Sequence, residues 1–405
     1  MLQGKHILVG ISGGIAAYKI PELIRSLVKA GAEVRVTTTK HALEFVTELT
    51  LQTVSGSRVY SDVFAAINEH ATEHISLPDW CDAMIVAPAT ANVLCKTAAG
   101  IADDALTTTI CSCVARKPIV IAPAMNDKMW ENPAVQNAIT TLRSWENLTV
   151  LEPAEGLLAC GTSGKGRMPE IEELQEAIEY ALTPKTMAGK RVLITAGGTQ
   201  EKIDPVRFIS NYSTGKMGFA LAHSCARRGA DVTLVCGAVS APLYNPLDKI
   251  HRIDALSAQA MYEACVAHWT NSDIAILCAA VADFTPATQA TEKIKKEAVS
   301  GKDSAFSIQL KETPDIAKTL GESKRKDQYL VGFALETEHE KENALRKLER
   351  KNLDAIVLNS LRDKGAGFEA DTNIVTILQS DGSTTALSLQ SKQIISEEIL
   401  TTLFS

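Results

Sequence analysis

The sequence is poor in aromatic residues and has no acidic block, no basic block and no long apolar run. Only 5% of its 405 residues are aromatic, whereas 45% are hydrophobic, with abundant Ala, Val, Ile and Leu. The formal net charge of −7 is spread along the chain, so no general nucleic-acid or membrane surface is predicted. This composition is typical of a protein of helices and parallel sheet, and the length favours two domains.

No CxxC pair occurs among the nine cysteines. An odd number of scattered cysteines predicts free thiols in a reducing compartment. Cys111 and Cys113 form a C-x-C pair, for which metal binding is the less favoured interpretation. The N-terminus leads directly into a short apolar strand that Gly10, Gly13 and Gly14 interrupt, so it predicts neither a signal peptide nor a membrane span. We therefore expect a cytoplasmic protein.

One sequence pattern occurs twice, near the N-terminus and near the middle of the chain. In each copy a buried strand, a glycine turn and an amphipathic helix lead to a second strand, and the helix ends at Gly31 or Gly229. The strands and helices expected from the two copies are residues 5–11, 15–30, 33–38, 191–196, 216–229 and 231–235. Two separately wound sheets are therefore predicted.

Further short apolar segments extend both predicted sheets. They are residues 83–87 and 118–122 in the first sheet, and 274–280, 329–334 and 354–358 in the second. Two more strands, 373–378 and 384–389, flank a turn at Asp381-Gly382. This pattern predicts an antiparallel addition before a last helix.

A boundary between the two sheets is expected at residues 184–189. This segment follows a helical run, contains Pro184 and Gly189, and precedes a new first strand, so it predicts a linker. The fold class is therefore α/β, with two Rossmann-like domains of mainly parallel sheet at residues 1–183 and 190–405. In such sheets ligands bind at the carboxyl ends of the strands.

Each predicted domain opens with a glycine turn, Ser12-Gly13-Gly14 or Gly197-Gly198. Backbone N–H groups and a helix N-terminus can approach a phosphate closely there. An NAD site also requires an acidic residue at the end of the second strand, but those strands end in Thr39-Lys40 and Cys236-Gly237. This favours a mononucleotide such as FMN, or a nucleoside triphosphate. For each domain alone, a turn that only packs helix on strand remains the alternative.

Polar side chains follow the expected strands of the first domain. They lie in Pro88 to Asn92, Asp103 to Thr108 and Pro123-Ala124-Met125-Asn126, and hydroxyls and amides suit the phosphate, ribityl chain and ring edge of a flavin. With the first glycine turn, this pattern resembles the flavoprotein family of cysteine decarboxylases that act on peptidyl-cysteine or phosphopantothenoylcysteine. The FMN-binding residues expected from it are Ser12, Gly13, Gly14, Thr39, Pro88, Ala89, Thr90 and Thr107.

The same resemblance implies three catalytic residues. Asn126 belongs to the family's substrate-carboxylate motif, His74 stands where the family has its histidine, and Cys160 lies in a glycine-rich segment that matches the substrate-covering flap. It implies that flavin oxidises the substrate thiol, that the carboxylate then leaves, and that Cys160 donates a proton to the product. Alone, such a histidine or cysteine is more often structural, but the combination favours catalysis.

The second domain carries a polar run from Thr195 to Gly218 that resembles the phosphopantothenate–cysteine ligase signature. Its Thr214-Gly215-Lys216 segment, leading a helix, also predicts an anion site. Lys202 stands where the family pattern has proline, a departure that affects a turn. Lys347 and Lys351 are four residues apart, so a helix places both on one face.

The ligase resemblance implies CTP, Mg²⁺, cysteine and 4′-phosphopantothenate as ligands. It also implies that CTP activates the 4′-phosphopantothenate carboxylate as an acyl-cytidylate, that the amine of cysteine attacks it, and that Asn211 positions or stabilises the intermediate. Asp283 is a candidate metal ligand, while the basic cluster around Lys293 is as a rule a solvated face. The two resemblances together imply substrate- and nucleotide-binding residues, namely Met125 in the first domain and, in the second, Arg207, Lys216, Leu277, Cys278, Ala279, Asp283, Lys293, Thr313, Pro314, Asp315, Ile316, Phe333, Lys347 and Lys351.

Taken together, the resemblances imply a bifunctional enzyme of coenzyme A biosynthesis, with ligation in the second domain and decarboxylation to 4′-phosphopantetheine in the first. By resemblance, decarboxylase domains form trimers with flavin sites between subunits and ligase domains form dimers, which implies a larger assembly such as a dodecamer. Two rivals are a non-catalytic regulatory flavoprotein, against which His74 and Cys160 argue, and an NAD(P)-linked oxidoreductase, against which the missing acids argue.

Overall fold

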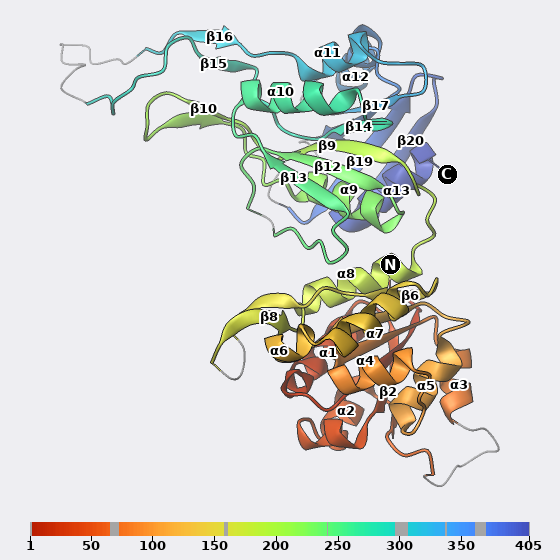
Figure 1. Cartoon of the computed structure of the whole chain (residues 1–405). Helices are drawn as coiled ribbons and strands as arrows, with labels where there is room; N and C mark the ends of the chain where they lie inside the picture. Colours follow the sequence, from red (N-terminus) through yellow and green to blue (C-terminus); the bar gives the residue numbers. More distant parts are fainter. Residues whose placement is uncertain are drawn as a thin grey trace. The chain divides into compact units, whose positions relative to one another are not determined.

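The computed structural model describes residues 2–64, 73–157, 161–240, 242–295, 307–336, 338–360 and 370–404. The chain divides into two compact units (Figure 1). The first contains Met1–Thr183 and Tyr244–Leu247, and the second contains Pro184–Leu243 and Asp248–Ser405. Met187 is buried in the core of the second unit.

A six-stranded sheet in the order β3-β2-β1-β4-β5-β6 forms the centre of the first unit. All neighbouring strands are parallel. The strands are β1 (His6–Ile11), β2 (Glu33–Thr38), β3 (Val59–Tyr60), β4 (Ala83–Ala89), β5 (Ile119–Pro123) and β6 (Leu148–Val150). This is the doubly wound order, in which the chain changes direction between β1 and β4 and leaves a crevice for a ligand there.

Helices cover both faces of this sheet because alternate strand residues point to opposite sides. Ile7 and Val9 of β1 pack in the core that includes α1 and α8, whereas Leu8 packs in the core that includes α4, α5 and α7. The helices are η1 (Ile15–Lys19), α1 (Ile20–Lys29), η2 (Lys40–Glu44), α2 (Glu48–Ser55), α3 (Glu73–Trp80), α4 (Ala91–Ala98), α5 (Ala105–Cys113), α6 (Asp127–Trp130), α7 (Pro133–Arg143) and α8 (Ile171–Leu182). A separate hairpin consists of β7 (Ala154–Leu157) and β8 (Ser163–Arg167).

The helix expected at 15–30 starts with a 3₁₀ turn, η1, before α1 begins at Ile20. Pro21 stands in the first turn of α1, where its missing N–H costs nothing because no intrahelical acceptor is available. The prediction of a helix here is confirmed, with a tighter first turn than expected.

An eight-stranded sheet in the order β13-β12-β9-β14-β17-β18-β19-β20 forms the second unit. It is parallel from β13 to β18, and β19 and β20 are antiparallel additions. The strands are β9 (Arg191–Ala196), β12 (Asp231–Cys236), β13 (Ile250–Asp254), β14 (Ile274–Leu277), β17 (Tyr329–Glu336), β18 (Ala355–Ser360), β19 (Thr372–Gln379) and β20 (Thr384–Ser391). Its first six strands repeat the order of the first unit, which confirms the predicted fold class.

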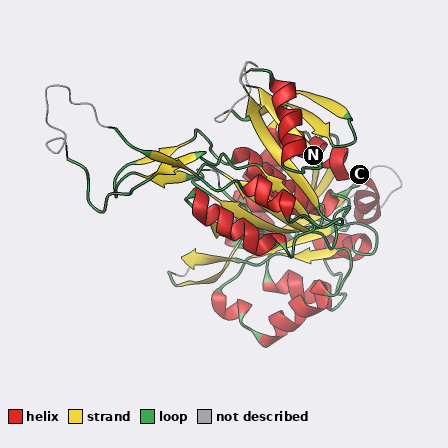
Figure 2. Ribbon diagram, turned by 90° about the horizontal axis from the view of Figure 1, so that it is seen from above, coloured by secondary structure: helices red, strands yellow, loops and turns green. Residues whose placement is uncertain are grey.

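Helices again lie on both faces of the sheet (Figure 1), and two small antiparallel sheets extend from it as an arm (Figure 2). The helices are α9 (Lys216–Arg227), α10 (Ala258–Trp269), α11 (Ile316–Glu322), α12 (Glu340–Arg350) and α13 (Lys392–Phe404). The arm contains β10 (Gln200–Lys202) paired with β11 (Phe208–Ser210), and β15 (Phe284–Pro286) paired with β16 (Leu310–Glu312). No helix in the described part of the chain has the length and apolarity needed to cross a membrane.

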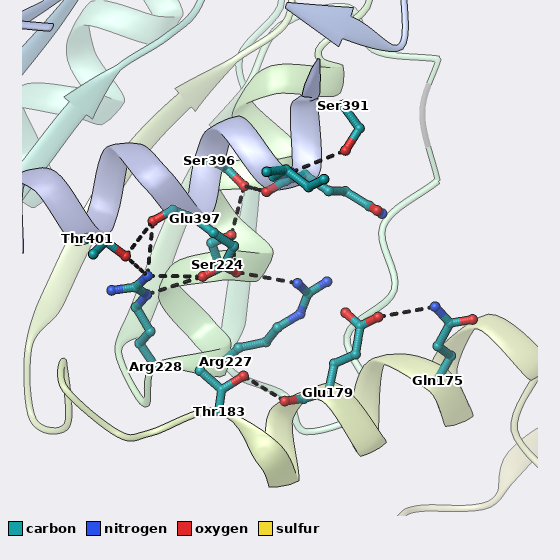
Figure 3. Close-up of polar contacts among 12 residues, drawn as sticks. Gln175, Glu179, Thr183, Ser224, Arg227, Arg228, Ser391, Ser396, Glu397 and Thr401 are labelled. Atoms are coloured by element: carbon teal, nitrogen blue, oxygen red, sulfur yellow. Dashed lines mark hydrogen bonds and ion pairs between the residues drawn. The ribbon is translucent and has the colours of Figure 1, made fainter. Parts of the chain in front are cut away.

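Helices α9 and α13 are joined by a polar cluster around the Glu397 carboxylate (Figure 3). Ser224 donates to Glu397 Oε1 at 2.6 Å, and Arg228 pairs with Oε2 at 3.1 Å. Arg227 lies 3.5 Å from Oε1 with a side chain only 4% exposed. Buried charges of this kind are tolerated only when they are paired, so the cluster fixes α13 against α9.

Candidate active sites

A pocket of about 1280 Å³ opens in the first unit at the carboxyl ends of β1 and β4. Its floor is the Ser12-Gly13-Gly14 turn, which follows β1 directly. Ser12 Oγ donates to the carbonyl oxygen of Pro88 at 2.7 Å and accepts from the N–H of Thr90 at 3.0 Å. Ser12 therefore ties the glycine turn to the end of β4 across the switch point, where a doubly wound fold binds its ligand.

The first pocket offers close backbone approach and an unused hydroxyl. A Cβ at Gly13 would lie 2.5 Å from His41 Cβ, so only glycine fits this turn. Thr39 is 6% exposed and lines the pocket, and its Oγ1 has no hydrogen-bond partner among the described residues. Buried hydroxyls are normally satisfied, so Thr39 is available to a polar ligand.

The other wall of the first pocket follows β5. Met125 and Asn126 line the pocket, and Asn126 is the N-cap of α6, with Oδ1 accepting from the N–H of Lys128 at 3.0 Å. The start of α6 therefore fixes the orientation of the Asn126 side chain. Arg167 of β8 lines the same cavity, so a cationic donor lies at this end of it.

A second pocket, of about 690 Å³, lies in the second unit at the carboxyl ends of β9 and β14. Hydroxyl groups hold the segment after β14 in place. Ala279 N–H donates to Thr195 Oγ1 and Ala282 N–H donates to Thr199 Oγ1, both at 3.0 Å, while Thr313 Oγ1 donates to the Ala282 carbonyl oxygen at 2.6 Å. The strand expected at 274–280 ends at Leu277, and two of the N–H groups that follow it, those of Ala279 and Ala282, bond to side chains.

Asn211 lines the second pocket and contacts this segment. Its Nδ2 donates to the carbonyl oxygens of Ala280 and Val281, at 3.3 and 3.2 Å. The side-chain orientation of Asn211 is therefore fixed by the backbone opposite, which leaves Oδ1 as the group that can act on a ligand.

Three lysines around the second pocket are each paired with a carboxylate. Lys347 Nζ lies 2.6 Å from Glu336, Lys351 Nζ 3.0 Å from Asp315, and Lys216 Nζ 2.7 Å from Asp371. The Lys216 ammonium also lowers the pKa of Asp371. The cationic groups expected to meet an anionic ligand are thus present and held in place.

Family models match the two units separately. The model described as Flavoprotein matches residues 1–183, and the model described as DNA/pantothenate metabolism flavoprotein C-terminal domain matches residues 187–405. The coenzyme A biosynthesis bifunctional protein CoaBC of Bacillus subtilis (strain 168) is 48% identical over 403 residues, which cover 99% of this chain and 97% of that protein. The chain belongs to the coenzyme A biosynthesis bifunctional proteins.

Two further proteins illustrate the match to these bifunctional proteins. The CoaBC protein of Vibrio vulnificus (strain CMCP6) is 45% identical over 399 residues, covering 98% of this chain and 97% of that protein. The crystal structure of the C-terminal domain of a coenzyme A biosynthesis bifunctional protein CoaBC is 41% identical, with a TM-score of 0.45, and covers 54% of this chain and 96% of that one. The family models and the two full-length relatives confirm the family predicted from the motifs.

Most residues predicted for the flavin site of this bifunctional protein lie together. Ser12, Gly13, Gly14, Thr39, Thr90, Met125 and Asn126 line the first pocket. Pro88 and Ala89 end β4 behind the turn, and Thr107 is a buried part of the capping box of α5. His74 lies on α3, outside the residues that line this pocket. Cys160 lies outside the described residues, so its role stays a prediction.

The nucleotide residues predicted for the second unit also gather in one pocket. Those that line it are Asn211, Lys216, Leu277, Cys278, Ala279, Asp283, Thr313, Pro314, Asp315, Ile316, Phe333, Lys347 and Lys351. Arg207 instead pairs with Asp204 and donates to the carbonyl oxygen of Ile294 at 2.8 Å, and Lys293 is exposed beside it. Neither lines the pocket.

Sequence reasoning missed two polar residues in the second pocket. Lys392, at the start of α13, lines it while only 7% exposed, and burial and the nearby Lys216 ammonium lower its pKa. Asn359 lines it with a buried Oδ1 that has no partner in the described part of the chain. Lys392 follows β20 and Asn359 lies within β18, and no local motif marks either residue.

The described residues contain no group of three or more His, Cys, Asp or Glu arranged to hold a metal ion. Asp283, the candidate metal ligand, is exposed at the mouth of the second pocket. A single carboxylate suits Mg²⁺ that is held mainly by phosphate oxygens.

Proposed function

We propose that the second unit joins cysteine to 4′-phosphopantothenate at the expense of CTP, and that the first unit, with FMN, decarboxylates the resulting 4′-phosphopantothenoylcysteine to 4′-phosphopantetheine. The observation that carries the proposal is that each unit has a pocket at its topological switch point, lined by most of the described motif residues of the corresponding activity. We assign decarboxylation to residues 1–183 and ligation to residues 190–405, with 184–189 between them.

The first pocket fits FMN by its shape and its donors. The glycine turn permits close approach of a phosphate, the unpartnered Thr39 hydroxyl suits a ribityl or phosphate oxygen, and Ser12 holds the turn and Thr90 in one arrangement. A flavin bound there would supply the two-electron oxidation of the substrate thiol that makes the neighbouring carboxylate able to leave, and in its reduced form would return the two electrons to the product.

The chain's own residues have three tasks in decarboxylation. Asn126 binds the substrate carboxylate through its amide N–H and so orients the bond that breaks. Cys160 donates the proton that completes the product, a task worth typically 10²–10⁴-fold in rate. His74 lies outside the pocket of its own unit, and a trimer with flavin sites between subunits would let it act in another subunit's site.

The second pocket fits a nucleoside triphosphate. Lys216, Lys347 and Lys351 supply three ammonium groups, and Asp283 with the phosphate oxygens would hold Mg²⁺. Asn211 acts on the activated carboxylate of 4′-phosphopantothenate through Oδ1, while its Nδ2 stays bonded to the backbone carbonyls. Attack by the amine of cysteine then forms the amide and releases CMP.

Exposed apolar side chains support assembly with further copies of this chain. In the second unit several of them lie on the arm, where Phe208, Phe284 and Leu310 are each about half exposed. Val206, which lies between β10 and β11, is exposed as well. Exposed apolar clusters of this kind mark interaction sites. We therefore propose dimers of ligase units and trimers of decarboxylase units, which combine into a larger assembly such as a dodecamer; a monomer in light scattering would overturn this.

We also propose a cytoplasmic location. The eight cysteines of the described residues are all free thiols, which suits a reducing compartment. A cell fractionation that follows the decarboxylase activity tests the location directly.

One assay tests both activities. The protein is given 4′-phosphopantothenate, cysteine and CTP, and pyrophosphate and carbon dioxide are followed together; both should appear. Asn211→Ala should stop both, yet leave decarboxylation of added 4′-phosphopantothenoylcysteine intact. Cys160→Ser should leave pyrophosphate release intact and stop formation of the reduced product. Pyrophosphate release without phosphopantothenate would overturn the ligase assignment, and a protein that binds no FMN would overturn the decarboxylase assignment.

A further inference from the structure

Strand β8 lies directly against the segment that carries Asn126. The N–H of Met125 donates to the carbonyl oxygen of Gly166 at 2.9 Å. A Cβ at Gly166 would overlap the carbonyl oxygen of Met125, and a Cβ at Gly164 would lie 2.9 Å from Asp127 Cβ. Glycine at position 166 therefore lets two backbones meet where any side chain would separate them, and glycine at position 164 leaves room for the Asp127 side chain.

The residue between these glycines makes two further contacts. Lys165 Nζ lies 2.5 Å from Glu152 Oε2 and 5.7 Å from the centre of the Trp130 ring, within reach of a cation–π interaction. Glu152 also pairs with Arg143 of α7. Burial alone would raise the pKa of Glu152, but hydrogen bonds from Lys165 and Arg143 outweigh it and leave the pKa below its usual value.

These contacts bracket the proposed carboxylate-binding residue on both sides. Gly166 holds Met125, which precedes Asn126, and Lys165 holds Trp130, which ends α6 four residues after it. Met125, Asn126 and Gly166 all line the first pocket. A shift of β8 would therefore move Asn126 relative to the flavin cradle.

We propose that Gly166 and Lys165 are positioning residues of the decarboxylase, which fix the segment 125–130 so that Asn126 meets the carboxylate of the substrate. Neither residue takes part in the chemistry. The inference rests on the proposed function of the first unit, and it assigns to β8 a share in discriminating the carboxylated substrate from the decarboxylated product.

The test uses the full-length protein with FMN and compares four variants. Lys165→Met removes the cation, Lys165→Arg keeps it, and Gly166→Ala forces β8 away from Met125. Lys29→Met, at an exposed lysine at the end of α1, is the matched control. The measurements are KM and kcat for 4′-phosphopantothenoylcysteine, the inhibition constant of 4′-phosphopantetheine, and the FMN content.

We expect Lys165→Met to raise KM for the carboxylated substrate roughly tenfold over Lys29→Met, and Gly166→Ala to lower kcat/KM on the order of 100-fold, because small displacements of a positioning group have effects of this size. Lys165→Arg should restore most of the loss. The inhibition constant of the product and the FMN content should stay unchanged, since neither depends on the carboxylate contact.

Two results would overturn the inference while leaving the proposed function intact. One is that Lys165→Met behaves as Lys29→Met does. The other is that substrate and product lose affinity equally, which would mean a general distortion of the pocket. Failure of the proposed function has a different signature, because the wild-type protein would then release no carbon dioxide from 4′-phosphopantothenoylcysteine. If Gly166→Ala does not fold, the two Lys165 variants alone decide whether β8 positions the segment 125–130.

Discussion

At the scale of single residues, Asn211 is a side chain whose orientation is fixed by the backbone next to it. Its amide nitrogen donates to the carbonyl oxygens of Ala280 and Val281. An aspartate has the same shape and cannot donate to either oxygen. Its charge would also face two carbonyl dipoles.

We predict that Asn211→Asp lowers the rate of amide formation on the order of 100-fold, because the side chain loses the contacts that orient Oδ1 and small displacements of a positioned group have effects of this size. Asn211→Ala should do the same without the added charge. The measurement is pyrophosphate release with cysteine present, and decarboxylation of added 4′-phosphopantothenoylcysteine is the internal control. A variant with normal ligation would contradict the role assigned to Asn211.

Cys278 lines the second pocket but is not a reactive thiol. Burial raises its pKa to about 12, so at pH 8 only about one molecule in 10⁴ carries the thiolate that reacts with electrophiles. We predict that iodoacetamide modifies the exposed Cys111 first and Cys278 far more slowly, and that the Cys278 rate rises with pH up to about 12. Peptide mass spectrometry over a time course checks this; equal rates at pH 8 would contradict it.

The residues of both sites could be predicted from sequence only where a motif is local. Ser12 to Gly14 and Thr313 to Ile316 are short runs that a strand end or helix start explains. Lys216, by contrast, finds its partner Asp371 at a separation of 155 residues, and no local pattern pairs them. Lys392 was missed for the same reason, since only the folded sheet brings it to the second pocket.

At the scale of secondary structure, the central strands were predictable because each is a buried apolar run that ends in glycine or polar residues. The short hairpins of the second unit could not be predicted. β10, β11, β15 and β16 have three residues each, too few to show an alternation of polar and apolar side chains. Their pairing depends on the rest of the second unit rather than on their own sequence.

The contact between α9 and α13 gives a prediction at this scale. Glu397 is the carboxylate that two largely buried arginines share, and removing one partner of a buried ion pair costs about 3–5 kcal/mol. We predict a loss of this order in the free energy of unfolding for Glu397→Ala, measured by urea denaturation. Glu398→Ala, at a neighbouring position whose carboxylate accepts from Gln390, should cost far less; equal losses would contradict the role of the cluster.

At the scale of the whole chain, each unit has its own sheet, its own pair of cores and its own pocket. The repeated strand–turn–helix pattern made the division of the chain into two units predictable. A ligand that binds only the native state of one unit stabilises that unit by about 2.7 kcal/mol at 100 times its dissociation constant.

We therefore predict two thermal transitions with different ligand responses. FMN at that excess should raise the midpoint of one transition by roughly 5–10 °C and leave the other in place, while CTP with Mg²⁺ should move the other. Differential scanning calorimetry of the holoprotein and of the FMN-stripped protein checks this. One transition that moves with either ligand would instead mean a single cooperative unit.

The carboxylates that accompany Lys216, Lys347 and Lys351 bear on turnover as well as on binding. Each ammonium already has an anionic neighbour, so an arriving triphosphate exchanges one counterion for another and gains only the difference in attraction. When pyrophosphate leaves, the same carboxylates can form ion pairs with the lysines again. We expect the second pocket to release its spent polyphosphate readily and to resist occupation by free inorganic anions.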